Sequence, residues 1–304
     1  MILLTGATGT VGTALLRRLT DELQPVRCLV RDPRRLGDQR VRVQIALGDL
    51  ADPASFRNAL RGVSTVVHLA ASIRDQPHAS IEELNGMATL RLVRAAERAG
   101  ARRFLFFSAL GASHHSRTRF FRAKALAQDA VATSSLETTT FSPSIVYSPG
   151  DPWLTLLERF SYLPAIPVSG SGDALYQPIW AEDVADGVVA ALRNGQADDR
   201  ARYELAGPDT LSYDDIVRLA LRSSGRRRRP LHVPLPLVRF SLRGLRLVVG
   251  PHVFATWDEA ELMEEPMVAA RGTADAEALG VRPAPMAAVL GLTGPGLRPV
   301  ARAA

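Results

Sequence analysis

Cysteine is almost absent from this chain of 304 residues. Cys28 is the single cysteine, which excludes a disulfide framework and a zinc site built from cysteines. No histidines and acidic residues have the spacing of metal ligands, so we expect no metal. No run of about eighteen apolar residues occurs, which excludes a membrane-spanning helix. The chain opens on MILLTGATG without a basic leader, so we expect no secretory signal and a cytoplasmic location.

Lysine is equally scarce. Of the 37 basic residues, Lys124 is the one lysine and the other 36 are arginine. The net charge of +6 and the isoelectric point near 10.2 suit an anionic partner, such as a phosphate-bearing cofactor, a nucleic acid or an anionic membrane. A GC-rich coding sequence that writes arginine for lysine explains the same composition, and we favour this explanation. A position that keeps lysine in such a chain is a candidate for a role that requires lysine.

Short apolar runs alternate with helical patterns through the first half of the chain. Strands are expected at 1–4, 26–30, 41–47, 65–70, 103–107 and 137–141, and helices at 10–21, 53–60, 81–99 and 120–133. Strands that alternate with helices of these lengths form a parallel sheet covered on both faces. Right-handed crossovers then favour an α/β fold with a doubly wound parallel Rossmann sheet.

The composition changes after Pro143, and prolines and glycines are frequent as far as Pro178. Helical patterns follow at 181–193, 213–223, 235–249 and 256–265. We predict a Rossmann domain at 1–147, with 177–205 returning to the sheet. A smaller, mostly helical substrate lobe is expected at 148–292, and a flexible tail at 293–304, which is rich in proline, glycine, alanine and arginine.

A glycine-rich turn follows the first predicted strand and reads TGATGTVG at 5–12. A pyrophosphate binds where backbone N–H groups converge at a helix N-terminus without side chains in the way. Gly6 is expected to make the tight turn, Gly9 to permit close approach, and Gly12 to pack the helix on the strand. A structural turn is the alternative, but the position after strand one of a βαβ unit favours a cofactor site. The predicted cofactor contacts here are Gly6, Thr8, Gly9, Thr10, Val11 and Gly12.

The end of the second strand bears on the choice of cofactor. An acidic residue there suits the ribose 2′-hydroxyl of NAD, whereas arginine suits the 2′-phosphate of NADP. The chain has Arg31, Arg34 and Arg35, whose guanidinium groups match phosphate oxygens. We predict NADP, with these three arginines as contacts. Asp32 keeps NAD open as the less favoured cofactor, and solvated charge is the other interpretation of the arginines.

The ends of strands three and four provide further candidates. Asp49 and Leu50 follow the third strand, where we expect them near the adenine, although Asp49 is also suited to turning the chain. Ala70 and Ala71 end the fourth strand with small side chains that let a ribose and nicotinamide pass close by. For His68 we favour a hydrogen-bonded core histidine over a functional one.

Taken together, these motifs resemble the short-chain dehydrogenase/reductase superfamily, and more narrowly its atypical, NmrA-like branch. The chain is also similar to the Rossmann-type accessory subunit of respiratory complex I and its bacterial relatives. The segments that carry the resemblance are TGATGTVG at 5–12, VRDP at 30–33, GDL at 48–50, HLAA at 68–71, FFSALGA at 106–112, FFRAKA at 120–125, SPSIVY at 142–147 and QPIWAEDVADGVVAAL at 177–192. The resemblance covers residues 1–224 well and the rest loosely.

The resemblance implies an active site that departs from the family pattern. The family's catalytic serine matches Ser108, and its Tyr-x-x-x-Lys pair matches Phe120 and Lys124. A phenyl ring has no proton to exchange, so the usual acid–base step is missing. The resemblance implies that Lys124 holds the nicotinamide ribose, that Pro143 and Ile145 are cofactor contacts, and that Ser108 and Tyr147 face the substrate.

Lys124, the single lysine, falls on the family's lysine position, which favours a nicotinamide cofactor in the family's pose. A surface lysine on an amphipathic helix is the alternative. If a proton donor is needed, His114, His115 and Tyr147 are the candidates, although loop histidines are more often solvated. Hydride transfer to a quinone or another activated acceptor asks less of the protein, because solvent protonates the product.

Two arginine-rich segments remain. Arg226–Arg229 suits nucleic acid or anionic lipid, but no nucleic-acid motif accompanies it, and a solvated loop is favoured. The helix expected at 235–249 carries Arg239, Arg243 and Arg246 on one face. Such a helix lies on membranes in some proteins, and we favour packing against the substrate pocket here.

The sequence thus predicts an NADPH-binding oxidoreductase of the atypical short-chain class, which acts on a small-molecule substrate such as a quinone, an enone or another activated carbonyl acceptor. A non-catalytic NAD(P)H-binding redox sensor, or an accessory or assembly protein, is the alternative. We expect no nucleic-acid partner, and peripheral membrane contact is the less favoured expectation.

Overall fold

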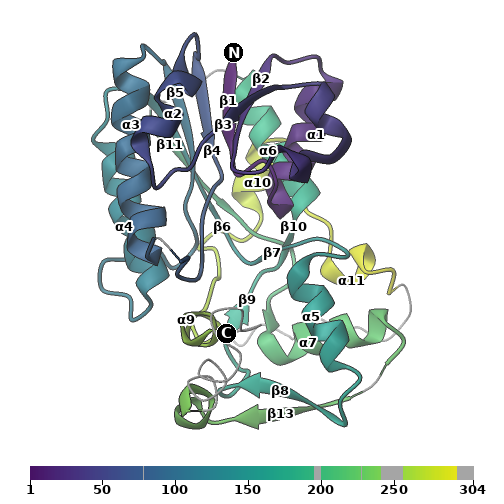
Figure 1. Ribbon diagram of the computed structural model, residues 1–304. Helices are drawn as coiled ribbons and strands as arrows, with labels where there is room; N and C mark the ends of the chain where they lie inside the picture. Colours follow the sequence, from purple (N-terminus) through teal and green to yellow (C-terminus); the bar gives the residue numbers. More distant parts are fainter. Residues whose placement is uncertain (78, 195–199, 227, 241–255, 293–304) are drawn as a thin grey trace.

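Seven parallel strands form the central sheet of the protein, for which a computed structural model describes residues 1–77, 79–194, 200–226, 228–240 and 256–292 (Figure 1). The strands lie in the order β11-β6-β5-β4-β1-β2-β3. Their bounds are β1 Ile2–Thr5, β2 Val26–Val30, β3 Gln44–Leu47, β4 Thr65–His68, β5 Arg103–Phe107, β6 Glu137–Pro143 and β11 Arg200–Leu205. This is the predicted doubly wound α/β fold, and the fold class is confirmed.

Helices cover both faces of this sheet. On one face lie α1 (Thr10–Asp21), α6 (Ala181–Arg193) and α10 (Ala274–Ala278), whose apolar side chains join one core cluster. On the other lie α2 (Pro53–Phe56), the 3₁₀ turn η2 (Arg57–Leu60), α3 (Ala88–Arg98) and α4 (Arg119–Ala132), packed around Phe104 and Phe106. Because both faces are buried at the centre of the sheet, β1, β2, β4 and β5 are mostly apolar and appear in the sequence as short hydrophobic runs. The edge strands β3 and β11 are more exposed, and β11 is also more polar.

The strand order reverses between β1 and β4, since β2 and β3 extend to one side of β1 and β4, β5 and β6 to the other. The loops that follow β1 and β4 therefore part at the carboxyl edge of the sheet. In open α/β sheets a crevice forms at such a point and binds ligands. The fold alone thus indicates where a site lies.

A second, smaller core lies beyond the carboxyl edge (Figure 1). Its elements are β7 (Val146–Tyr147), α5 (Pro152–Phe160), β8 (Ala165–Ser169), β9 (Leu175–Tyr176), β10 (Ile179–Trp180), β12 (Leu211–Ser212), α7 (Tyr213–Ser223), β13 (Arg229–Val233), α9 (Trp257–Leu262) and α11 (Met286–Val289). Three two-stranded sheets, β7–β10, β9–β12 and β8–β13, accompany the helices of this lobe.

The structure differs from the expected elements at several places. Residues 41–47 shorten to β3, because Asp32 caps a 3₁₀ segment η1 (Pro33–Val41) with Pro33 in its first turn. The long helix expected at 81–99 begins with a π-helical segment, η3 (Glu83–Met87), before α3. Helix α5 was not predicted, although Asp151 caps it by accepting a hydrogen bond from Leu154 N and Pro152 is its first residue.

Parts of two further predictions lie outside the described residues. Of the helix expected at 235–249, residues 235–240 are helical and the rest is not described. The tail predicted at 293–304 also lies outside. Among the helices of the described ranges, we find none with the length and apolar character needed to cross a membrane.

Candidate functional site

Two positions at the connection between β1 and α1 leave no room for a side chain and require glycine. Gly6 has a φ of +75°, and a Cβ there would lie 2.6 Å from Ala70 N on the loop after β4. A Cβ at Gly12 would lie 2.0 Å from Gly6 O, so the first turn of α1 packs directly on the glycine turn. A Cβ at Gly9 would meet Gly6 O at 3.4 Å and nothing nearer. Gly9 therefore leaves room in front of the loop, and Gly12 packs on the loop more than on the strand.

The N-terminus of α1 lies next to this space, and its first amide groups have no partner within the helix. Gly9 is the N-cap and has no side chain to accept from the first turn. The first N–H groups of a helix have no partner within it, which leaves those of Thr10, Val11 and Gly12 available. Partial positive charge accumulates at such a terminus and favours a phosphate group.

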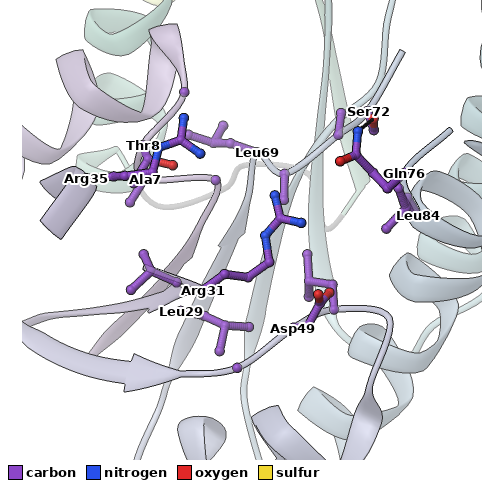
Figure 2. Close-up of a pocket in the computed structure, with 17 residues that line it drawn as sticks. Ala7, Thr8, Leu29, Arg31, Arg35, Asp49, Leu69, Ser72, Gln76 and Leu84 are labelled. Atoms are coloured by element: carbon purple, nitrogen blue, oxygen red, sulfur yellow. Dashed lines mark hydrogen bonds between the residues drawn. The ribbon is translucent and has the colours of Figure 1, made fainter. Parts of the chain in front are cut away.

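A pocket of about 330 Å³ opens in front of the loop, at the reversal of the strand order (Figure 2). Four strand ends and their loops contribute to it. Its lining residues are Gly6, Ala7, Thr8, Gly9, Leu29, Val30, Arg31, Arg35, Gly48, Asp49, Leu50, Leu69, Ala70, Ala71, Ser72, Gln76 and Leu84. The pocket therefore joins the glycine turn to the ends of β2, β3 and β4, as a bound dinucleotide requires.

The three arginines after β2 do not share one role. Arg31 extends into the pocket between the glycine turn and Asp49, and Arg35 also lines it (Figure 2). Arg34 does not line it; its side chain is 84% exposed and its Nε lies 2.9 Å from Asp32 Oδ1. Asp32 also accepts from Arg34 N, and this pairing lowers the pKa of its carboxyl. Asp32 is therefore paired outside the pocket. An acid that binds a ribose hydroxyl would instead have to point into the pocket.

Asp49 and Leu50 line the opposite side of the pocket. Ser55 Oγ accepts from Asp49 N at 2.8 Å, and Asp49 Oδ1 accepts from Ala51 N at 2.9 Å. Asp49 thus both turns the chain and lines the pocket. The place of Asp49 near the adenine stays a prediction.

His68 is a core residue behind the pocket, as favoured from the sequence. Its Nδ1 lies 2.7 Å from Thr5 Oγ1 and its Nε2 lies 2.9 Å from Thr89 Oγ1. Thr89 Oγ1 donates to Asn85 O at 2.6 Å, so it accepts from a protonated Nε2 and leaves Nδ1 to accept from Thr5. Burial, with the nearby charge of Lys124, lowers the pKa of His68 to about 3. The ring is therefore neutral and holds β1, β4 and the helix behind the pocket together.

Lys124 lies on α4 and is buried beside two aromatic rings. It is not exposed on a solvated face of the helix. Its Nζ donates to Phe107 O at 2.6 Å and lies 5.1 Å from the ring centre of Phe106 and 5.7 Å from that of Phe120. Burial lowers the pKa of this amine to about 7. The alternative of a surface lysine is wrong. The phenyl ring at the tyrosine position borders the amine and offers it no hydrogen bond.

Ser108 and Tyr147 are also buried, and neither lines the pocket. Ser108 Oγ accepts from Gln128 Nε2 at 2.6 Å, one helical turn beyond Lys124. Among the residues that the structure describes, the Tyr147 hydroxyl has no hydrogen-bond partner, and burial raises its pKa. Ser108 and Lys124 therefore lie where the carboxyl end of β5 meets the middle of α4, while Tyr147 lies in the core of the smaller lobe.

The structure gathers some of the predicted cofactor residues and not others. Gly6, Thr8, Gly9, Arg31, Arg35, Asp49, Leu50, Ala70 and Ala71 line the pocket, whereas Thr10, Val11, Gly12, Arg34, Lys124, Pro143 and Ile145 do not. Sequence reasoning missed Ser72, Gln76 and Leu84, which come from the segment after β4 and carry no motif. Leu29 and Val30 had a usable signal, since they are the last residues of a strand at the crevice.

His114, one of the candidate proton donors, lies in a solvated loop. Its Nε2 is 2.8 Å from Asp129 Oδ2, and the side chain is 48% exposed. His115 is exposed beside it. Neither lines the pocket.

The fold and the pocket define a dinucleotide-binding Rossmann protein. The chain belongs to the NAD(P)H-binding family, whose model matches residues 6–195. The resemblance to the short-chain dehydrogenases/reductases is confirmed at this level.

Curated relatives differ in their stated roles. A mitochondrial NADH dehydrogenase [ubiquinone] 1 alpha subcomplex subunit 9 from Arabidopsis thaliana is 29% identical over 77% of this chain, and the match spans 60% of that relative's length. The photosystem II assembly factor Ycf39 of Guillardia theta is 28% identical over 79% of this chain and 75% of the relative. An NAD(P)H azoreductase of Xenophilus azovorans is 27% identical over 81% of each.

Solved structures show the same fold. A nucleoside-diphosphate-sugar epimerase from Staphylococcus aureus superposes with a TM-score of 0.76 at 22% identity, over 95% of this chain and 99% of that one.

Proposed function

We propose that this protein binds NADPH and transfers hydride to a quinone, an enone or another activated carbonyl acceptor. The observation that carries the proposal is Arg31, whose guanidinium lies in the pocket while Asp32 is paired outside it. A planar guanidinium binds phosphate oxygens in pairs, so Arg31 and Arg35 suit a 2′-phosphate.

The other pocket residues have separate tasks in this proposal. The amides at the start of α1 bind the diphosphate. Asp49 and Leu50 border the adenine, and Ala70 and Ala71 let the chain of the dinucleotide pass over β4. Lys124, Pro143 and Ile145 remain the proposed contacts for the nicotinamide end. When bound, the cofactor supplies a hydride.

The proposed class of acceptor follows from the residue at the tyrosine position. Phe120 donates no proton, so the acid–base group that the family uses at this position is missing. A quinone or an enone takes the hydride onto a conjugated system, and solvent then protonates the product. Ser108 and Tyr147 are retained as the proposed substrate-facing residues.

A non-catalytic role is the second candidate, as a redox sensor or as an accessory or assembly protein. It is favoured by the burial of Ser108, Lys124 and Tyr147, none of which lines the pocket. Two relatives carry the names of a respiratory complex subunit and an assembly factor.

Binding assays with two arginine variants test the cofactor. Arg31→Ala is expected to weaken NADPH binding about ten- to a hundredfold, the value of charge-assisted hydrogen bonds, and to leave NADH binding unchanged. Arg34→Ala is the matched control and is expected to change neither, because its side chain pairs with Asp32 and does not line the pocket. If both variants keep the wild-type preference, the 2′-phosphate assignment is wrong.

Turnover distinguishes the two functions. NADPH oxidation is measured with a panel of quinones, enones and aldehydes. Consumption with quinones or enones and none with simple aldehydes supports the proposed reductase. Tight NADPH binding without turnover of any acceptor supports the non-catalytic role.

A further inference from the structure

Positive charge is strongly segregated within this chain. From residue 216 to residue 257 the sequence has nine arginines and no aspartate or glutamate. The whole chain carries +6, so the remainder carries a small net negative charge. A GC-rich coding sequence explains many arginines, but it gives no reason for gathering them where no acid occurs.

The structure brings several of these arginines together in a groove of about 470 Å³ between the end of α7 and the start of β13. Arg218, at one end, is paired with Asp214 at 2.8 Å and Asp215 at 3.0 Å. Arg222 and Arg229 also line the groove, and neither forms an ion pair with any residue in the described ranges. The groove therefore carries a positive charge that the described part of the protein does not neutralise.

Two more arginines of the groove are held in place by the turn after α5. The guanidinium of Arg226 stacks 3.5 Å above the ring of Tyr162, and its Nη1 donates to Ser161 Oγ at 2.8 Å. Arg228 Nε donates to the backbone oxygens of Ser161 and Leu163, each at 3.1 Å. Tyr162 is itself 69% exposed. The groove is thus a fixed arrangement of guanidinium groups with an exposed aromatic ring at its rim.

Apolar side chains are exposed beside the groove. In the parallel pair β8–β13, Ala165 pairs with Arg229 and Pro167 with Leu231. Since Ile166 and Val168 of β8 are buried toward α5, these partners occupy the outer face of the sheet. Leu231 is 57% exposed, and Leu163 is 45% exposed.

The apolar character continues along the chain beyond β13. Leu237 and Phe240, in the helical residues 235–240, are 56% and 77% exposed. Strands β8 and β13 lie at the end of the molecule away from the seven-stranded sheet (Figure 1). We call the surface made by Arg222, Arg226, Arg228, Arg229, Tyr162, Leu163 and Leu231 the basic–apolar face.

We propose that the basic–apolar face docks on an anionic lipid membrane. Guanidinium groups bind headgroup phosphates, and exposed leucine and aromatic side chains beside them enter the acyl boundary. Nucleic acid would satisfy the arginines alone and would leave Leu163 and Leu231 in water. The two chemistries occur side by side, which favours lipid. The proposal reverses the sequence-based preference for a solvated loop, and it is independent of the cofactor proposal.

Vesicle co-sedimentation of the full chain tests the proposal. Wild type is expected to bind vesicles of phosphatidylcholine mixed with phosphatidylglycerol, and not vesicles of phosphatidylcholine alone. The double variant Arg222→Gln/Arg229→Gln is expected to lower the partition coefficient roughly ten- to thirtyfold. Leu231→Ser is expected to lower it severalfold without any change in charge. All three substituted positions are exposed, and urea unfolding checks that the variants fold.

The matched control is Arg34→Gln/Arg117→Gln, which removes the same charge from two exposed positions elsewhere. It is expected to bind vesicles like wild type. Equal losses in both double variants would mean that net charge alone governs binding, and would overturn the proposal. Binding to duplex DNA that depends on Arg222 and Arg229 and is unaffected by Leu231→Ser, with no vesicle binding, would also overturn it and assign the groove to nucleic acid.

Discussion

At the residue scale, two helical glycines differ in what a side chain would meet. A Cβ at Gly12 in α1 would lie 2.0 Å from Gly6 O, whereas a Cβ at Gly187 in α6 would lie 3.5 Å from Leu279 Cδ1, an ordinary contact. Gly12→Ala is expected to lower the free energy of unfolding by about 1–3 kcal/mol through overpacking, and to abolish NADPH binding by displacing the glycine turn.

Gly187→Ala is the control for that substitution. It is expected to leave the free energy of unfolding within about 1 kcal/mol of wild type or to raise it, because alanine favours the helix. Urea unfolding and NADPH titration measure both effects. Wild-type binding by Gly12→Ala would contradict the contact between α1 and the turn.

The buried amine of Lys124 predicts a pH dependence. Its folded pKa of about 7 lies below the ordinary value of 10.5, so between these pH values the unfolded chain binds the extra proton. Stability therefore rises with pH across this window, by at most about 1.4 kcal/mol per pH unit. Lys124→Met lacks this contribution. Urea unfolding at several pH values from 7 to 10 is expected to show a steeper rise for wild type, and equal slopes would contradict the burial.

Local sequence motifs predicted many residues of the candidate site. Gly6, Arg31 and Asp49 each follow a strand in a recognisable motif, and all three line the pocket. Ser72 and Gln76 line it too, but their segment has no motif. Arg34 was also predicted as a cofactor contact, but in the structure it pairs with Asp32, two residues before it, and does not line the pocket.

At the element scale, two arginines attach α9 to the nucleotide domain: Arg74 lies 2.5 Å from Glu259 on α9, and Arg119 makes the second link. Arg119, at the start of α4, lies 3.0 Å from Asp75, 2.7 Å from Glu82 and 3.4 Å from Asp258 on α9. Arg119→Met is expected to lower the free energy of unfolding by about 1–2 kcal/mol, the sum of a few partly exposed pairs. Amide hydrogen exchange in α9 is expected to accelerate.

The exposed Arg117→Met serves as its control and is expected to change neither quantity. Arg119 lowers the pKa of Glu82 to about 2. The contribution of this pair is therefore complete above pH of about 4.5 and is lost as the pH falls toward 2. Wild type and Arg119→Met are expected to converge in stability at low pH, and a constant difference would contradict the ion pairs.

Element types were predictable where the hydrophobic period was long and unbroken, as in α1 and α6. They were missed where proline and glycine, which interrupt regular patterns, were frequent. Helix α5 lies in the proline- and glycine-rich stretch, yet its Asp151–Pro152 start is a regular helix signal. The π-helical segment η3 has no sequence signature, because its hydrogen-bond pattern depends on how Asn85 and its neighbours pack.

At the scale of the whole molecule, cofactor binding and stability are linked. A ligand that binds only the folded chain stabilises it by about 2.7 kcal/mol at a hundred times its dissociation constant. NADPH is therefore expected to raise the melting temperature of wild type by several degrees, and to raise that of Arg31→Ala less at the same concentration. An identical rise in both, measured by thermal unfolding, would contradict the contribution of Arg31.

The sequence by itself determined the doubly wound sheet, the glycine turn and the arginine at the end of β2, because each depends on neighbours within a few residues. Only the tertiary structure decided which of these side chains meet. It buried Lys124 under Phe106 and Phe120, left Arg34 outside the lining of the pocket and gathered distant arginines between α7 and β13. The physical reason is that burial and pairing depend on elements far apart in the chain, whose packing no local pattern records.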